Sequence, residues 1–196
     1  MNEIADTILI KRILSGDKDR AYEKLMQKYE GRIKNLAFMM IGNRTDCEDL
    51  AQESFIRAFK ALPNFQRKAK FSSWLYQITI NLCKDYLKAK SRGARNIEEE
   101  HLETVDAGPG QTGVRHVLMD EVSFKMAQAL NKIPAIYREA FVRREVLTQD
   151  YREIAEATKT SADTVRVRAY RAREMLRELL AKDVDTFWRE KAAKAK

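Results

Sequence analysis

Residues 150–180 read DYREIAEATKTSADTVRVRAYRAREMLRELL, which predicts a short helix, a tight turn and a longer arginine-rich helix. Asp150 is followed three residues later by Glu153, which is the spacing of a capping box, and Ser161 is suited to cap the second helix. Apolar residues recur every three or four positions along that second helix, so one side of it is expected to face a core. We therefore predict a helix-turn-helix, with the inward residues Val165, Ala169, Ala172, Leu176 and Leu179.

The opposite side of the second helix carries its charge. A helix that lies in a DNA major groove presents guanidinium groups to base edges and phosphates in this way. The alternative is an amphipathic surface helix with solvated arginines, but two capped helices at this spacing favour the DNA-binding interpretation. The outward row is Arg166, Tyr170, Arg173 and Arg177, flanked by Arg168 and Arg171.

The composition favours a soluble, helical and basic protein. Of the 196 residues, 44% are hydrophobic and 34% are charged, and the formal net charge is +8. Strand patterns are almost absent, and 7 Gly and 3 Pro leave few breaks, so we expect an all-α fold. No segment approaches the roughly 20 apolar residues of a membrane span, and no signal sequence is recognisable. We expect a cytoplasmic protein that does not contact a membrane.

The cysteine and histidine pattern argues against a metal site. Cys47 and Cys83 are isolated from each other in the sequence, and the two histidines, His101 and His116, lie far from both. We therefore expect no metal, no cofactor and no disulfide framework. Both cysteines are expected to be buried apolar residues.

Helical periodicity divides the chain into two small helical domains joined by a flexible acidic linker. The linker, residues 93–118, carries five acidic and two basic residues and is rich in Gly. The first domain covers residues 1–92, the second covers 119–182, and a basic tail covers 183–196. The expected helices are residues 4–14, 18–40, 45–62, 72–90, 119–130, 135–147, 150–158 and 161–180.

The helix expected at residues 45–62 has an acidic outer side. Thr45 and Glu48 have capping-box spacing at its start. Its predicted inner residues are Cys47, Leu50, Ala51, Ser54, Ala58 and Leu62. Such a face either binds a partner or is simply solvated. The outward residues are Asp46, Glu48, Asp49, Gln52, Glu53 and Arg57.

A basic segment with Phe at each end precedes the helix expected at residues 72–90. That helix has an inner side with Phe71, Leu75, Ile78 and Leu82, and its opposite side is polar and basic. By itself this pattern fits a solvated face and a nucleic-acid surface equally well. The rings of Phe65, Phe71 and Trp74 fit a core better than a stacking surface. The outward polar residues are Gln77, Asn81, Lys84 and Lys88.

Two ordered segments resemble the small bacterial sigma factors of the extracytoplasmic-function (ECF) group of the sigma-70 family. Residues 46–65, DCEDLAQESFIRAFKALPNF, and 71–90, FSSWLYQITINLCKDYLKAK, are similar to the family's polymerase-binding and promoter-melting helices. Residues 129–146, ALNKIPAIYREAFVRREV, together with the helix-turn-helix, are similar to its domain for the upstream (−35) promoter element. A helix-turn-helix alone fits many families, whereas two signatures in order are specific.

This resemblance implies a protein without enzymatic activity that directs RNA polymerase core to promoters. The implied partners are the core enzyme, double-stranded upstream and single-stranded downstream (−10) promoter DNA, and, as in many relatives, an anti-sigma factor. The implied polymerase-binding residues are Asp46, Glu48, Asp49, Gln52, Glu53 and Arg57. The implied downstream-element residues are Asn64, Phe65, Lys70, Ser72, Trp74, Gln77, Asn81, Lys84 and Lys88. The implied upstream-element residues are Ser161, Thr164, Arg166, Val167, Arg168, Tyr170 and Arg171.

Two positions depart from the family pattern. The turn between the two recognition helices usually reads leucine-glycine and here reads Thr158-Lys159; a left-handed residue other than glycine costs about 1 kcal/mol. Asp163 stands where a small residue is common, which adds a carboxylate near the DNA end of the second helix.

Other functions remain as alternatives. A stand-alone helix-turn-helix regulator would bind DNA as a dimer, at two half-sites about 34 Å apart. A nuclease is disfavoured, because the acidic residues form helix faces and not a convergent metal cluster. The acidic linker either mimics a nucleic-acid backbone inside the polymerase or is a plain tether.

Overall fold

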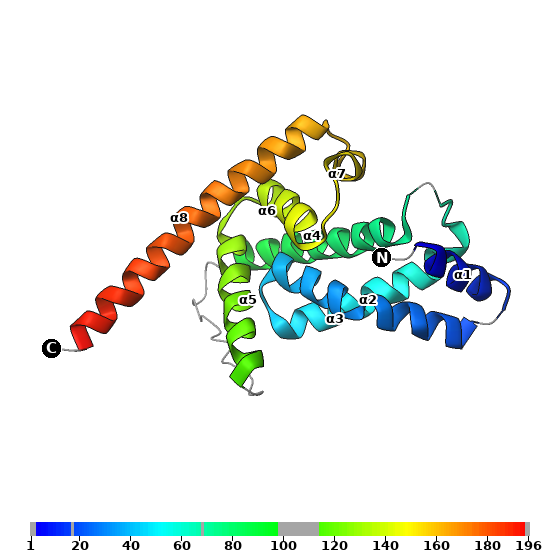
Figure 1. The fold of residues 1–196 in the computed structure, drawn as a ribbon, viewed down its shortest axis with the longest axis horizontal. Coiled ribbons are helices and arrows are strands. Elements are labelled where there is room, and N and C mark those ends of the chain that lie inside the picture. The colour runs from blue at the N-terminus through cyan, green and yellow to red at the C-terminus, as the bar shows by residue number, and fades with distance from the viewer. Residues whose placement is uncertain (1–2, 17, 68, 98–113, 195–196) are drawn as a thin grey trace. The chain divides into compact units, whose positions relative to one another are not determined.

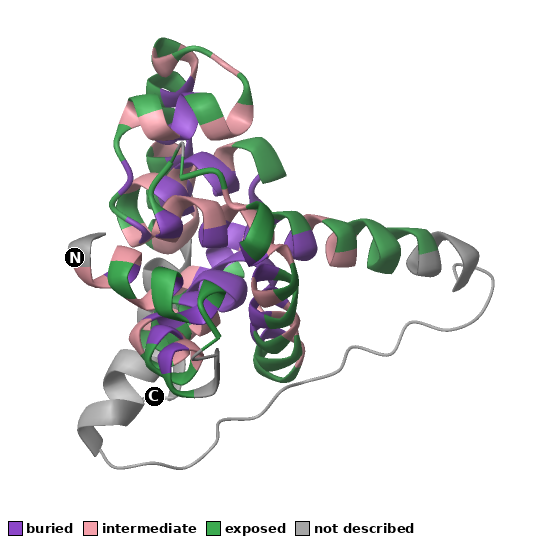
Figure 2. Ribbon diagram, turned by 90° about the vertical axis from the view of Figure 1, so that its right-hand side faces the viewer, coloured by how far each residue is buried: buried purple, intermediate pink, exposed green. Residues whose placement is uncertain are grey.

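The structure, a computed structural model, describes residues 3–16, 18–67, 69–97 and 114–194. Every regular element within these ranges is a helix, which confirms the predicted all-α class (Figure 1). The chain forms two compact units, unit 1 (Met1–Thr112) and unit 2 (Gly113–Lys196). In each unit the buried residues form stripes along the helices (Figure 2).

Unit 1 is built around its second helix. This helix packs against α1, α3 and α4, and α3 also packs against α4. Residues three or four positions apart line its buried side, namely Ala21, Leu25, Tyr29, Ile33, Leu36 and Met40. The elements of the unit are α1 (Glu3–Leu14), α2 (Lys18–Ile41), α3 (Arg44–Ala61), the 3₁₀ turn η1 (Leu62–Asn64) and α4 (Phe71–Ile97).

A buried polar contact joins α1 to α2. The Tyr29 hydroxyl donates to Asp6 Oδ2 at 2.6 Å, and Lys28 forms an ion pair with the other oxygen of the same carboxylate. Burial and the hydrogen bond to Asp6 raise the pKa of Tyr29, so the hydroxyl stays a donor. The first helix is therefore held by more than apolar contact.

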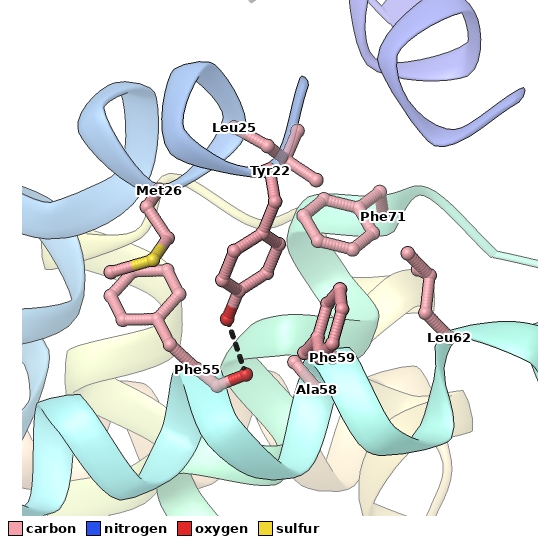
Figure 3. A pocket seen from close by; sticks show the side chains of 8 residues that line it. All are labelled: Tyr22, Leu25, Met26, Phe55, Ala58, Phe59, Leu62 and Phe71. Carbon is pink, nitrogen blue, oxygen red and sulfur yellow. Dashed lines mark hydrogen bonds between the residues drawn. The ribbon is translucent and has the colours of Figure 1, made fainter. Parts of the chain in front are cut away.

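Aromatic side chains fill the space between α2 and α3. The Tyr22 hydroxyl donates to the Phe55 carbonyl oxygen at 2.7 Å, and the Tyr22 and Phe59 rings lie 4.5 Å apart (Figure 3). The cavity between them measures about 10 Å³, which is room for about one water molecule. Phe55 is buried, although the periodicity did not place it among the inward residues. We interpret this region as hydrophobic core.

The start of α3 corrects one prediction. The helix begins at Arg44, and its cap is Asn43, whose side chain accepts from the Asp46 backbone N–H at 3.1 Å. Asn43 has an extended backbone, which suits a capping residue, whereas Thr45 already lies inside the helix. The capping prediction for Thr45 was therefore wrong.

Two residues that were predicted to face the core are only half-buried, namely Leu50 of α3 and Ile78 of α4.

Helices extend into both ends of the predicted linker. The fourth helix continues to Ile97, and α5 already begins at Val114. Gly93 weakens a helix by about 1 kcal/mol without ending it, and the alanine and arginines around it favour helix. The linker residues 98–113, which include the five acidic ones, lie outside the described residues.

Unit 2 is built around the long helix α8, which packs against α5, α6 and α7. The single helix predicted at residues 135–147 is instead an α-helix followed by a π-helical turn. The eighth helix runs past the predicted end at residue 180, because residues 181–194 contain neither Gly nor Pro to stop it. The elements are α5 (Val114–Lys132), α6 (Ala135–Phe141), the π turn η2 (Val142–Val146), α7 (Tyr151–Thr158) and α8 (Ala162–Lys194).

Both cysteines are buried and free, as the sequence predicts. Burial raises the pKa of the Cys47 thiol to about 11 and that of the Cys83 thiol to about 12. At pH 8 both thiols are therefore protonated and unreactive. We expect alkylation by iodoacetamide, followed by mass spectrometry, to be at least about 100-fold slower in the native protein than in urea. Rapid native alkylation of either thiol would contradict this burial.

Candidate nucleic-acid interface

Caps and a left-handed turn set the geometry of the helix-turn-helix. Asp150 Oδ1 accepts from the backbone N–H groups of Arg152 and Glu153 at 2.9 and 2.8 Å. Ser161 Oγ accepts from the Thr164 N–H at 3.1 Å. Lys159 adopts the left-handed conformation, with φ 54° and ψ 44°. The predicted caps and the predicted left-handed turn are confirmed.

A small core fixes which side of α8 faces outward. Ile154 of α7 packs with Val165 of α8, and both are 1% exposed. Further along α8, Ala169, Ala172 and Leu176 are also buried, whereas Leu179 is half-buried. The predicted inward stripe is therefore present. Its burial leaves the arginine row on the solvent side of the helix.

The first half of α8 borders an open groove in unit 2. The groove has a volume of about 390 Å³, and the N-terminal end of α6 contributes Ile136 and Tyr137 to its lining. Arg171 Nη1 donates to the Tyr137 hydroxyl at 3.2 Å. Sequence reasoning missed both α6 residues, because only tertiary packing brings α6 beside α8. The α8 residues that line the groove are Asp163, Thr164, Val167, Arg168 and Arg171.

The predicted upstream-element residues share this exposed region. Arg166, Val167, Tyr170, Arg171 and Ser161 are exposed. Thr164 and Arg168 are half-buried. Val167 and Tyr170 are apolar or aromatic residues with 50% and 59% of their surface accessible, which suits contact with base edges and methyl groups. The α8 surface therefore combines guanidinium donors with exposed apolar contacts.

Arg166 is held by neighbours on both helices of the motif. Its Nη1 lies 2.7 Å from Asp163 Oδ1, and its Cζ lies 5.4 Å from the centre of the Tyr151 ring. A second guanidinium, that of Arg144, lies 4.7 Å from the same ring, and it donates to the Gln149 carbonyl oxygen at 2.9 Å. Two arginines thus lie against the same ring at the start of α7, and Arg144 was not among the residues singled out from the sequence.

Most of the acidic side of α3 is exposed as predicted, but Asp46 and Glu53 are half-buried. Glu53 forms an ion pair with Arg57 at 2.7 Å. Asp46 is half-buried and accepts from the Tyr86 hydroxyl, which ties α3 to α4. Ile56 on α3 is 39% exposed and adds an apolar side chain to this surface that the periodicity did not identify. The residues that remain exposed are Glu48, Asp49, Gln52 and Arg57.

Aromatic rings border the basic segment before α4. Phe71 is buried, and its ring centre lies 5.5 Å from that of Tyr29 and 5.7 Å from that of Trp74. Phe65 and Trp74 are half-buried, with ring centres 4.8 Å apart. Phe71 therefore belongs to the core, whereas Phe65 and Trp74 form its accessible edge.

The polar residues predicted for the downstream element lie along α4 and the segment before it. Gln77 Nε2 donates to Asn81 Oδ1 at 2.8 Å. Arg67 in the preceding segment has a left-handed backbone, with φ 56°. The exposed residues are Asn64, Lys70, Asn81 and Lys88, and the half-buried ones are Ser72, Gln77 and Lys84.

The described residues contain neither a cluster of potential metal ligands nor a helix that could cross a membrane. No group of three or more His, Cys, Asp or Glu side chains is arranged to hold a metal ion. None of the described helices combines the length and apolar character that crossing a bilayer requires.

Comparison with known proteins decides the family. Residues 25–93 match the family model described as Sigma-70 region 2, and residues 123–176 match the model described as Sigma-70, region 4. The RNA polymerase sigma-H factor of Pseudomonas aeruginosa is 33% identical over 181 residues, which cover 89% of this chain and 93% of the relative. The chain belongs to the sigma-70 family. Two further relatives specify the ECF group within that family.

These two relatives are ECF sigma factors by name. The ECF RNA polymerase sigma-E factor of Haemophilus influenzae is 32% identical, over 89% of this chain and 94% of the relative. The ECF RNA polymerase sigma factor SigW of Bacillus subtilis is also 32% identical, over 87% of this chain and 94% of the relative. The chain is therefore an ECF sigma factor, and the stand-alone regulator is not favoured. Sigma factors are transcription initiation factors and not enzymes.

Solved structures agree on the fold. CnrH, solved in complex with the cytosolic domain of CnrY, superposes with a TM-score of 0.67 at 24% identity, over 91% of this chain and 99% of CnrH. The sigma factor RpoE of Bartonella quintana, solved with the anti-sigma factor NepR, gives a TM-score of 0.66 at 22% identity, over 82% of this chain and 96% of RpoE. The predicted downstream and polymerase-binding residues lie within the region 2 match, and the upstream residues lie within the region 4 match.

Proposed function

We propose that this sigma factor binds RNA polymerase core through the outer face of α3, opens the −10 element with α4 and reads the −35 element with α8. The observation that carries the proposal is the pairing, in one chain, of region 2 and region 4 with an exposed arginine row on α8. The protein itself catalyses no reaction on this proposal. It works in the cytoplasm, where the polymerase transcribes DNA.

The acidic face of α3 has the chemistry of a protein interface. Asp49 and Glu48 are exposed on the same helix as the exposed apolar Ile56, so complementary charge and apolar burial can act together. Asp46 contributes less to binding, because Tyr86 already engages its carboxylate. We assign polymerase binding chiefly to Glu48, Asp49, Gln52, Glu53 and Arg57.

The α4 face suits an opened DNA strand. Lys84 and Lys88 are one helical turn apart, a spacing that can follow a phosphate backbone. The partly accessible rings of Phe65 and Trp74 lie at the same end of the helix as Lys70 and Ser72, and such rings can stack on unpaired bases. We assign recognition and melting of the −10 element to this face.

An anti-sigma factor is a further proposed partner. CnrH and the Bartonella RpoE were each solved with a protein bound to them, and NepR is described as an anti-sigma factor. These relatives support regulation of this chain by sequestration.

Reconstitution tests the proposed function. The purified chain is added to RNA polymerase core, and transcription starts are mapped on genomic DNA. We expect specific starts only when both are present. A stand-alone regulator would instead bind a palindromic site tightly without the polymerase, and specific starts would be absent.

Single substitutions on α8 separate base reading from phosphate binding. Arg166→Ala or Arg171→Ala is expected to relax preference at one or two base pairs of the −35 element by about 1–3 kcal/mol, because arginine pairs two donors with guanine. Arg177→Ala is the control, since Arg177 lies further along the helix and is paired with Glu174 at 2.6 Å. Holoenzyme affinity is measured for single-base promoter variants. A uniform loss with both Arg166→Ala and Arg171→Ala would assign these residues to phosphate contacts.

A further inference from the structure

If α8 reads the −35 element as proposed, Asp163 places a carboxylate at the end of the helix that approaches the DNA. It is the second residue of the helix, and its side chain is 85% exposed. It lines the same groove as Thr164, Val167 and Arg171. Phosphates repel a carboxylate, so this residue weakens binding to DNA in general unless a base compensates for it.

Stabilisation of the fold by the ion pair with Arg166 does not explain why an aspartate stands at position 163. Oδ1 of Asp163 and Nη1 of Arg166 are 2.7 Å apart, but both side chains are mostly exposed, and such pairs contribute little. The pair does fix geometry. An acceptor and a donor lie three residues apart on α8, and the Tyr151 ring beneath Arg166 holds the donor in place.

This spacing matches neighbouring base pairs. Three residues advance a helix by about 4.5 Å, and successive base pairs are about 3.4 Å apart. In the major groove a carboxylate accepts from the amino group N4 of cytosine, whereas arginine donates to O6 and N7 of guanine. The groove-facing acceptors of guanine and thymine repel a carboxylate, and adenine places its N7 acceptor next to its N6 donor. Cytosine presents only a donor, so it is the base that best compensates for the charge.

We propose that Asp163 is a specificity-determining residue that selects cytosine at one position of the −35 element, beside the base pair that Arg166 contacts. The inference rests on the proposed function of α8 and goes beyond it by naming the base. It also assigns Asp163 two effects on binding. The carboxylate lowers affinity for all DNA, and it restores affinity only for sites with cytosine at that position.

The experiment uses holoenzyme assembled from the full chain and RNA polymerase core. Bound DNA is selected from a promoter library that is randomised across the −35 element, and the selected sequences are counted. We expect the unaltered protein to enrich cytosine at one position and Asp163→Ala to lower that enrichment about tenfold. Positions other than the neighbouring one that Arg166 contacts should keep their preferences. Asp163→Asn is expected to shift the preference at that position towards adenine, because an amide pairs with adenine N6 and N7.

Matched controls separate this effect from charge and folding. Glu178→Gln removes an exposed carboxylate from the same helix, about 15 residues further along, and should leave every base preference unchanged. Thermal unfolding of each variant monitors folding. Unchanged cytosine enrichment in Asp163→Ala, or an equal change at every position, would overturn the inference while the function of α8 stands. If the unaltered holoenzyme selects no −35 sequence, the proposed function fails as well.

Discussion

Replacing Glu139 by alanine is expected to destabilise unit 2 by about 3–5 kcal/mol, because it removes a carboxylate that pairs with the buried charge of Arg143. Arg143 is fully buried, and its Nε donates to Glu139 Oε1 at 3.0 Å. Its Nη1 also donates to Gln149 Oε1 at 3.2 Å. A domain of this size has on the order of 5–10 kcal/mol of stability, so the loss is a large fraction of the total.

Removing both charges should have a much smaller effect. The double variant Glu139→Leu with Arg143→Leu fills the site with apolar side chains and is expected to recover most of the loss. Recovery is incomplete, because Gln149 Oε1 then loses its donor. This comparison shows how much of the cost comes from the stranded charge.

Hydrogen exchange with mass spectrometry measures the effect on unit 2 separately from unit 1. Faster exchange is expected in α6 and α7 but not in α2. Glu174→Ala is the control, because its partner Arg177 is exposed and such ion pairs contribute at most about 1 kcal/mol. Equal effects of Glu139→Ala and Glu174→Ala would mean that Arg143 does not depend on its carboxylate.

Asp49→Arg is expected to weaken binding of RNA polymerase core about 10- to 100-fold. The reversal places a cation where the proposed interface requires an anion, and like charges brought together at an interface cost several kcal/mol. Asp49 is exposed, so the change should leave the helix content of unit 1 unaltered. Because the effect is electrostatic, the ratio of affinities should shrink as salt is raised.

The control for this variant is Glu23→Arg, which makes the same change of charge on the exposed surface of α2. Affinity is measured by titrating labelled chain with core at two salt concentrations, and circular dichroism measures helix content. Core affinity that is unchanged in Asp49→Arg, or lowered equally in both variants, would count against the α3 face.

Much of this protein could be predicted from local sequence patterns. The inward stripe from Val165 to Leu176 follows from helical periodicity, and the caps at Asp150 and Ser161 follow from side chains that accept backbone hydrogen bonds within a few residues. The resemblance in two ordered segments was sufficient to identify the family that the comparisons confirm. The roles of individual residues at the proposed interfaces stay predictions.

The errors arose where local signals compete. Asn43 and Thr45 are both capping residues two positions apart, and only the backbone conformation decides between them. The linker was predicted to begin at Gly93, where the composition changes, yet one glycine destabilises a helix too little to end it. Pattern alone sets such boundaries poorly, because the free-energy differences are about 1 kcal/mol or less.

The sequence by itself determined the elements of this protein: their helical character, their buried sides, the helix-turn-helix and the exposed arginine row. Those features depend on neighbours within a few residues along the chain. Only the tertiary structure decided that Tyr86 engages Asp46, that Tyr137 reaches Arg171, and that Tyr151 lies beside both Arg144 and Arg166. These contacts join different helices, some of them 34 and 40 residues apart in sequence, and packing between the helices places their side chains within reach of one another.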